Sequence, residues 1–183
     1  MPPSLDIYVP SRLRDRETIL RFVERYVDRD ASNDREDEEL MILRLGARPS
    51  ELGPWEWEPA RTLDHIIERG VDVPWRAFTV FLKSRDERCD GAELGFTVDG
   101  SVVFGLSVDD AEGVDLGGGP IDAIAAARNR ACAKEILHEL AAAFGGEAGF
   151  LAWEHPLPLL DEAFPNAESG MVPYVWSPLE RSD

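Results

Sequence analysis

Residues 94–108 have the sequence LGFTVDGSVVFGLSV, in which two apolar segments flank Asp99-Gly100. The Asp-Gly pair supplies the positive φ angles that a tight type I′ turn requires, so this stretch predicts a β-hairpin. In that prediction Asp99 and Gly100 are the central residues of a two-residue turn, and Val98 pairs with Ser101. The hairpin indicates a sheet in which strands that follow one another in sequence pair antiparallel.

Further strands are predicted on both sides of the hairpin, from alternation of apolar residues or from runs of β-branched and aromatic residues. They are Leu5–Val9, Leu40–Leu45, Trp55–Glu58, Ala77–Leu82, Phe150–Trp153 and Tyr174–Trp176. Apolar spacing at i, i+3, i+4 and i+7 predicts a helix over Ile19–Val27, and a second is expected to begin at Pro59 and to end at Gly70.

The longest predicted helix covers about Ile121 to Phe144 and is stopped by Gly145-Gly146. Its apolar positions predict a face that packs against the sheet. The residues expected on that face are Ile124, Ala127, Ala131, Ile136, Leu137, Leu140 and Phe144.

The strands outnumber the helices, and several strands are neighbours in the sequence. The predicted fold class is therefore α+β, a single domain with a mainly antiparallel sheet and about three helices packed on it. A chain of 183 residues is long enough to bury its own core. Because no repeat or linker divides it, we expect one domain over residues 1–183, with a Pro-rich acidic C-terminal segment from about residue 154.

The charge balance is unusual, since 36 Asp and Glu residues against 19 Lys and Arg residues give a net charge of −17. Such a surface repels a phosphate backbone, so no nucleic-acid partner is expected. No apolar stretch approaches the ~20 residues that span a bilayer, and the N-terminus lacks a secretory signal. We therefore expect a cytoplasmic protein without a membrane partner. Cys89 and Cys132 lack a CxxC partner, so neither a disulfide framework nor a zinc site is expected.

Two loops have features of ligand sites. Asp28–Glu39 places oxygen-bearing side chains where a calcium loop needs them, but Asn33 stands at the glycine position and Arg35 adds a cation. A solvated acidic loop is the preferred interpretation, and calcium binding stays open. The triple glycine 117–119 precedes the long helix, as in phosphate-binding loops, but acidic neighbours would repel an anion.

Catalytic arrangements are sparse in this sequence. Glu135 and His138 have the spacing of a di-iron helix, but the second copy that such sites need is absent from the sequence. Cys89 lies in the Arg85–Asp90 loop and is expected to be an exposed bystander; the alternative is a reactive thiol whose pKa is lowered by Arg85 and Arg88. Cys132 is expected to belong to the core.

An enzyme remains the alternative from a different class. Its candidate residues are Glu154 and His155 at a strand end together with Asp109 and Asp110, acting as a carboxylate/His hydrolase with or without a divalent metal. The preferred interpretation assigns no catalytic residue, no metal and no cofactor.

The C-terminal part of the sequence favours a binding surface. Between Lys134 and Arg181 there are eight acidic residues, six aromatic residues and no Lys or Arg. Acidic groups steer a basic protein, and aromatic side chains anchor it. The expected partner-binding residues are Trp153, Glu154, Asp161, Glu162 and Trp176. The alternative is an acidic layer that only closes the core.

A small, acidic α+β protein of this kind resembles the immunity proteins that neutralise bacterial toxins. The resemblance lies in size, charge and the lack of a catalytic motif, and it implies that the partner is a basic toxin or effector. A second alternative is an acidic secretion chaperone, since the predicted order from Leu63 to Phe144 (helix, three strands, long helix) is similar. The function expected from the sequence is therefore a non-enzymatic acidic protein-binding module.

Overall fold

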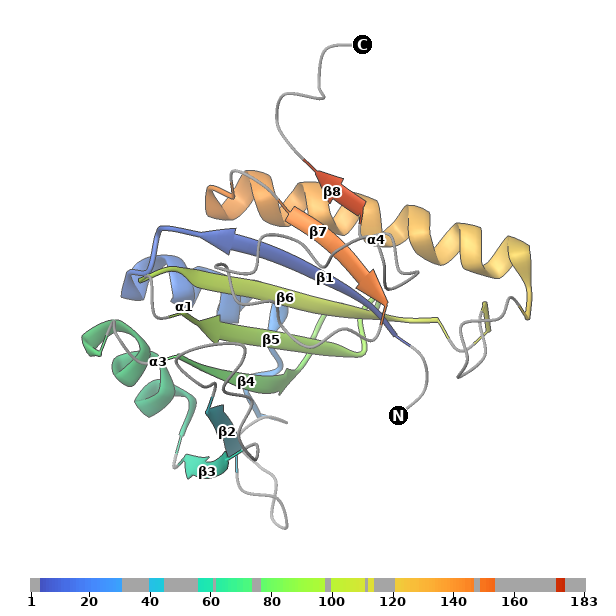
Figure 1. The fold of residues 1–183 in the computed structure, drawn as a ribbon. Helices are drawn as coiled ribbons and strands as arrows, with labels where there is room; N and C mark the ends of the chain where they lie inside the picture. Colours follow the sequence, from blue (N-terminus) through green and yellow to red (C-terminus); the bar gives the residue numbers. More distant parts are fainter. Residues whose placement is uncertain are drawn as a thin grey trace.

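The computed structural model describes residues 4–30, 40–44, 56–60, 62–73, 77–97, 100–110, 112–113, 121–146, 149–153 and 174–176. Three helices are interspersed among the strands of the described residues (Figure 1). Their order is β1 (Ser4–Ser11), α1 (Arg16–Tyr26), β2 (Leu40–Arg44), β3 (Glu56–Ala60), α3 (Leu63–Asp72), β4 (Phe78–Lys83), β5 (Gly91–Phe96), β6 (Val102–Asp109), α4 (Ala123–Phe144), β7 (Gly149–Trp153) and β8 (Tyr174–Trp176).

The eight strands of the described residues belong to one sheet, in the order β3-β2-β4-β5-β6-β1-β7-β8. Every neighbouring pair is antiparallel. Strand β1 comes first in the sequence but pairs between β6 and β7, so it joins the central meander to the C-terminal strands. Three helices and an antiparallel sheet in the described residues confirm the predicted α+β class.

The main core lies between the helices and one face of the sheet. Ile7 and Val9 of β1 alternate with side chains that point to the opposite face, and both are fully buried in this core. The ring of Phe22 of α1 lies 4.9 Å from that of Phe104 of β6 in a tilted arrangement and 5.7 Å from that of Phe144 of α4 edge-to-face, measured between ring centroids. This aromatic cluster joins two helices to the middle of the sheet.

Local side chains fix the helix ends. Asp15 accepts a hydrogen bond from the Thr18 backbone N–H at 2.9 Å, and Thr62 caps α3 in the same way. Asp122 caps α4 by accepting from two backbone N–H groups. Gly145 ends α4 in the left-handed region at φ 66°, a conformation that a residue with a Cβ adopts at a cost.

The hairpin forms, but its turn is one residue longer than predicted. Thr97, not Val98, faces Ser101: the Thr97 N–H donates to the Ser101 carbonyl at 3.1 Å, and the register continues as Phe96 opposite Val102. Gly100 has φ 85°, as the Asp-Gly signal required, and its N–H donates to the Thr97 carbonyl. Such a three-residue loop with glycine at the left-handed position is the next commonest hairpin connection.

Two predicted element boundaries were wrong. Pro59 does not start a helix but pairs with Met41 inside β3, and α3 begins at Leu63. Gly70 does not end α3 but lies within it, where a Cβ would stand 2.2 Å from the ring of Phe96. Close approach of helix to sheet therefore requires glycine there.

The predicted sheet-facing side of α4 was right only for its second half. Ile136, Leu137 and Phe144 are buried, whereas Ile124 is 82% exposed and Ala127 is exposed as well. In the first half the buried residues are Ala125, Asn129 and Ala133. Consistent with these small contacts, the first half of α4 extends beyond the ends of the strands (Figure 1).

Candidate functional site

Exposed acidic side chains lie together at one end of the sheet, where β5 begins and β6 ends. The Asp90 N–H donates to the Ser107 carbonyl at 2.8 Å, which places Asp90 beside the strand that ends at Asp109. Both side chains are exposed. Partial burial and the negative charge of Asp109 raise the pKa of Asp90. The two carboxylates thus reinforce each other's negative potential.

The segment after β6 is tied to the first half of α4. The Asn129 side-chain amide donates to the Asp110 carboxylate at 2.9 Å and to the Asp109 carbonyl at 3.2 Å. The Gly113 carbonyl accepts from the Ile121 N–H at 2.9 Å, just before α4 begins. Asp110 is only 5% exposed, so it holds this connection together and does not present a carboxylate to a substrate.

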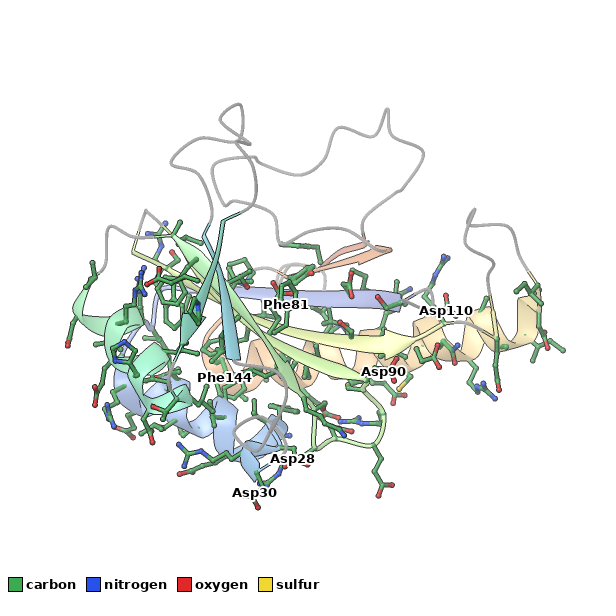
Figure 2. The ribbon with its side chains drawn as sticks, turned by 90° about the horizontal axis from the view of Figure 1, so that it is seen from below. Asp28, Asp30, Phe81, Asp90, Asp110 and Phe144 are labelled. Carbon is green, nitrogen blue, oxygen red and sulfur yellow. The ribbon has the colours of Figure 1, made fainter. Side chains whose placement is uncertain are left out.

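Two large exposed apolar side chains lie at the N-terminal end of α4, Ile121 just before the helix and Ile124 in its first turn. Ile121 is 63% exposed and Ile124 is 82% exposed. Asp122 lies between them, and Glu112 is paired with Arg128 on the next turn at 3.1 Å. Figure 2 shows Asp90 and Asp110 on the side of the molecule toward which the N-terminal half of α4 extends, whereas Phe144 lies toward the other side.

We call this region the acidic end. It consists of the exposed acids Asp90, Asp109, Glu112 and Asp122 and the exposed Ile121 and Ile124. Apolar side chains set among charged groups provide both the burial and the charge that a protein interface uses. The sequence contained the acids of this end, but its interpretation placed Ile124 in the core.

The structure places two of the five sequence-predicted binding residues by their backbones alone. Trp153 of β7 pairs with Leu5, which pairs in turn with Val108, so Trp153 lies at the same end of the sheet as the acidic end. Trp176 of β8 pairs with Gly149, four residues away along β7, which is about 14 Å. Glu154, Asp161 and Glu162 lie outside the described residues, as does His155.

A buried carboxylate lies on the other face of the sheet from the main core. Glu93 of β5 is 5% exposed and accepts hydrogen bonds from the hydroxyls of Thr79 at 2.7 Å and Tyr8 at 3.2 Å. Burial raises the pKa of Glu93 to about 7. Gly105 lies between the two partner strands, where a Cβ would stand 2.9 Å from Glu93 and 3.1 Å from the Tyr8 ring. The glycine allows the phenol to cross β6.

Glu93 was not selected from the sequence. The one available signal is an acidic residue inside an apolar strand, since Glu93 follows Ala92 and precedes Leu94. Burial of an ionisable group at a hydrogen-bonded site is a feature of functional centres, although structural clusters show it too. The same surroundings raise the pKa of Tyr8, through burial first and then through Glu93 and Asp6.

The predicted exposure of Cys89 was wrong, and its pKa is shifted in the direction opposite to that of the reactive alternative. Cys89 is 8% exposed, and burial together with Asp86 raises the pKa of its thiol to about 12. The lowering effect of Arg88 is smaller because that guanidinium is bound by two carboxylates, Asp86 at 2.7 Å and Glu139 at 3.1 Å. Cys132 is half-buried against the main core.

The other candidate sites have only partial outcomes. Asp28 and Asp30 are the described members of the tested calcium loop, and residues 31–39 and 117–119 lie outside the described residues. On α4, Glu135 is exposed and His138 is half-buried. Among the described residues no three His, Cys, Asp or Glu side chains stand close enough to hold a metal ion. No helix in the described part of the chain is long and apolar enough to cross a membrane.

Comparison with known proteins gives no match: the chain matches no family model, no curated protein and no solved structure. Its function is therefore inferred from its own geometry and charge.

Proposed function

We propose that this protein is a non-enzymatic binding module that captures a basic protein, and that the partner is a toxin or effector of the kind that immunity proteins inhibit. The observation that carries the proposal is the acidic end, where Ile121 and Ile124 project into solvent among exposed carboxylates. A basic partner is the occupant that complements both the acids of this end and the net charge of −17.

The distribution of the arginines supports this interpretation. Six of them form ion pairs with acids of the described part: Arg16, Arg25, Arg29, Arg69, Arg88 and Arg128. Arg14 and Arg85 donate to backbone carbonyls instead. Most of the described arginines are thus engaged within the molecule, while the excess acids face solvent. Such a field speeds the association of a cationic partner by roughly 10- to 1000-fold at low salt.

Charge steers a partner, but lasting affinity needs apolar anchors that are buried on binding. Ile124 and Ile121 supply them at the acidic end. Trp153 lies at the same end by its strand register, so we propose that the surface continues into the C-terminal segment. Its further residues in this proposal are Glu154, Asp161, Glu162 and Trp176.

The test uses variants with matched charge changes. The protein captured from a lysate of the source cells by the immobilised wild-type chain at low salt is purified, and its binding kinetics are measured. Asp90→Lys with Glu112→Lys is compared with the control Glu17→Lys with Asp72→Lys, which makes the same charge change on α1 and α3. We expect the first pair to slow association about tenfold more than the control. Ile124→Ser is expected to speed dissociation with little change in the association rate.

Several results would overturn the proposal. If both charge-changed pairs slow association equally, the acidic end is not the docking surface. If binding does not depend on salt, or no protein is captured, the partner is not recognised by charge. Melting curves of each variant show whether a loss of binding reflects unfolding.

Each alternative function has one favourable observation. For a hydrolase it is Glu93, because a carboxyl with a pKa of about 7 can exchange a proton at neutral pH. For a secretion chaperone it is the order α3, β4, β5, β6, α4, which matches the predicted helix, three strands and long helix. Glu93→Gln separates the first from the proposal, since a binding module keeps its partner after this change, whereas a hydrolase that uses Glu93 loses turnover.

A further inference from the structure

One line of side chains along α4 faces away from the sheet. Its positions are separated alternately by four and three residues, so they lie on one side of the helix, opposite the buried Ile136 and Leu140. We call this line the outer ridge. Its exposed members are Ile124, Arg128, Ala131, Glu135 and Ala142, with the half-buried His138 between the last two. Side chains in this spacing form the seam along which two helices pack lengthwise.

Large exposed apolar side chains lie at both ends of the outer ridge. Ile121 and Ile124, 63% and 82% exposed, lie at its N-terminal end. Leu13, 46% exposed, lies at its C-terminal end, since a Cβ on Gly145 would stand 3.0 Å from Leu13 Cδ1. These are three of the four large apolar side chains that are exposed among the described residues. A symmetric contact between two copies of the chain buries both ends at once.

The charges of the outer ridge are self-complementary, because Arg128 and Glu135 lie on either side of its middle. Residues 123–135 carry three cations and one acid, so this stretch lacks the acidic excess of the whole chain. Two copies with a net charge of −17 therefore repel each other least here. Arg128 pairs with Glu112 at 3.1 Å, but this pair lies at the exposed surface and holds Arg128 only weakly.

We propose that a second copy of this chain binds along the outer ridge, with the two α4 helices antiparallel about a two-fold axis at the level of Ala133. In this arrangement Ile124 of each copy lies on Ala142 of the other, so a large side chain meets a small one. Ile121 of each copy comes to the end of the other helix where Leu13 is exposed.

The charges decide the relative direction of the two helices. In the antiparallel pair, Arg128 lies about one turn (~5 Å along the axis) from Glu135 of the other copy, and its long side chain spans that gap. A parallel pair sets Arg128 against Arg128 and Glu135 against Glu135, which is repulsive. Because the two-fold axis repeats each contact, the antiparallel dimer gains two ion pairs.

The contact is narrow, because alanine occupies positions 131 and 142. We expect a weak dimer, with a dissociation constant on the order of 10–100 µM, as for interfaces smaller than about 1,200 Å². Added salt should strengthen it, because repulsion between two copies of net charge −17 outweighs two ion pairs. Salt should weaken capture of a basic partner instead. Ile124 belongs to both surfaces, so a second copy and a basic partner exclude each other.

The test is sedimentation velocity of the full chain at moderate salt, from about 5 to 500 µM protein, which brackets the expected dissociation constant. Wild type is expected to pass from monomer to dimer over this range. Arg128→Glu and Glu135→Arg should each weaken the dimer about tenfold or more, because each turns two attractive contacts into repulsive ones. An equimolar mixture of these two variants should form a heterodimer, since every Glu at one position then faces an Arg at the other.

Two controls make the same charge changes away from the outer ridge. Arg130→Glu changes an exposed residue on the flank of α4, and Asp72→Arg changes an exposed residue at the end of α3. Both are expected to dimerise within about threefold of wild type, since net charge alone acts weakly at moderate salt. Melting curves of all four variants verify that each is folded.

The proposal is wrong if wild type stays monomeric at every protein and salt concentration. It is also wrong if the ridge variants and their controls weaken the dimer equally, or if the mixed variants remain monomeric. Capture of a basic partner is measured with dilute protein at low salt, where the chain is monomeric. Failure of the dimer is therefore distinguishable from failure of the proposed function.

Discussion

The two halves of α4 share a composition rich in alanine but differ in what surrounds them. In the second half, Leu140 and Phe144 are buried against the sheet and α1. In the first half, Ile124 is 82% exposed, and the sheet side carries the small Ala125 and the hydrogen-bonded Asn129. A helix of 22 residues is about 33 Å long and extends past the strands beneath it. Large apolar side chains hold the second half of α4, whereas small side chains and the hydrogen bonds of Asn129 hold the first.

The largest effect expected from this contrast is on stability. Phe144→Ala removes a ring that contacts Phe22, Phe104 and Tyr26, and it should lower the free energy of unfolding by about 3–5 kcal/mol. Ile124→Ala should change it by less than about 0.5 kcal/mol, because its side chain buries little surface. Denaturant unfolding of both variants measures the difference. Equal losses would mean that the first half of α4 is packed after all.

The contrast between buried and exposed groups extends to the acids. Burial raises the pKa of Glu93 to about 7, so the folded state holds its proton more tightly than the unfolded state does. The stabilisation is complete below the unfolded pKa, near 4.5, and is lost as the pH rises through 7. The loss should be on the order of 3 kcal/mol. Glu93→Gln should remove this decline in thermal stability between pH 5 and 8, whereas Asp90→Asn should keep most of it. The same slope in Glu93→Gln and wild type would contradict the assignment.

The two ends of α4 also differ in the residues that cap them. Gly145 has φ 66°, and a Cβ there would lie 3.0 Å from Leu13, so Gly145→Ala should cost about 1 kcal/mol or more. Asp122→Ala removes the N-cap at the free end and should cost about 1 kcal/mol. Hydrogen exchange should separate the two, with Asp122→Ala raising exchange only in the first turns of α4. Exchange raised along the whole helix would show that its halves are not independent.

The features of this fold that could be predicted from the sequence are those set by residues adjacent in the chain. The extent of α4 was predictable because Asp122 and Gly145 act on adjacent backbone groups. Its facing side was not, because alanine occupies both sides and the large Ile124 biased the pattern. The turn at Gly100 was recognised by its residue type, but its length depended on whether Thr97 or Val98 faced Ser101.

The candidate site shows the same limit. Glu93 is buried under a tyrosine that lies 85 residues away, so its raised pKa depends on a strand order that no local pattern contains. Cys89 was predicted from Arg88 beside it in the sequence, yet that arginine is engaged by Glu139 of α4, 51 residues away. A charged neighbour in the sequence therefore does not predict the electrostatic potential at a side chain when the fold pairs that neighbour with a residue distant in the sequence.

The smallest expected effect is that of salt on stability, and it comes from the exposed region alone. Screening weakens the exposed pair of Arg128 with Glu112, but it also weakens the repulsion among the excess acids, including that between Asp90 and Asp109. With a net charge of −17 repulsion is the larger sum, so the melting temperature should rise by a few degrees as sodium chloride increases from low to moderate concentration. Asp90→Lys should start from a higher melting temperature and respond less to salt, because it replaces one repulsive contact with an attractive one. A melting temperature that falls steadily with added salt would mean that the ion pairs outweigh the repulsion. The acidic end would then lack the excess negative potential on which the proposed capture of a basic partner depends.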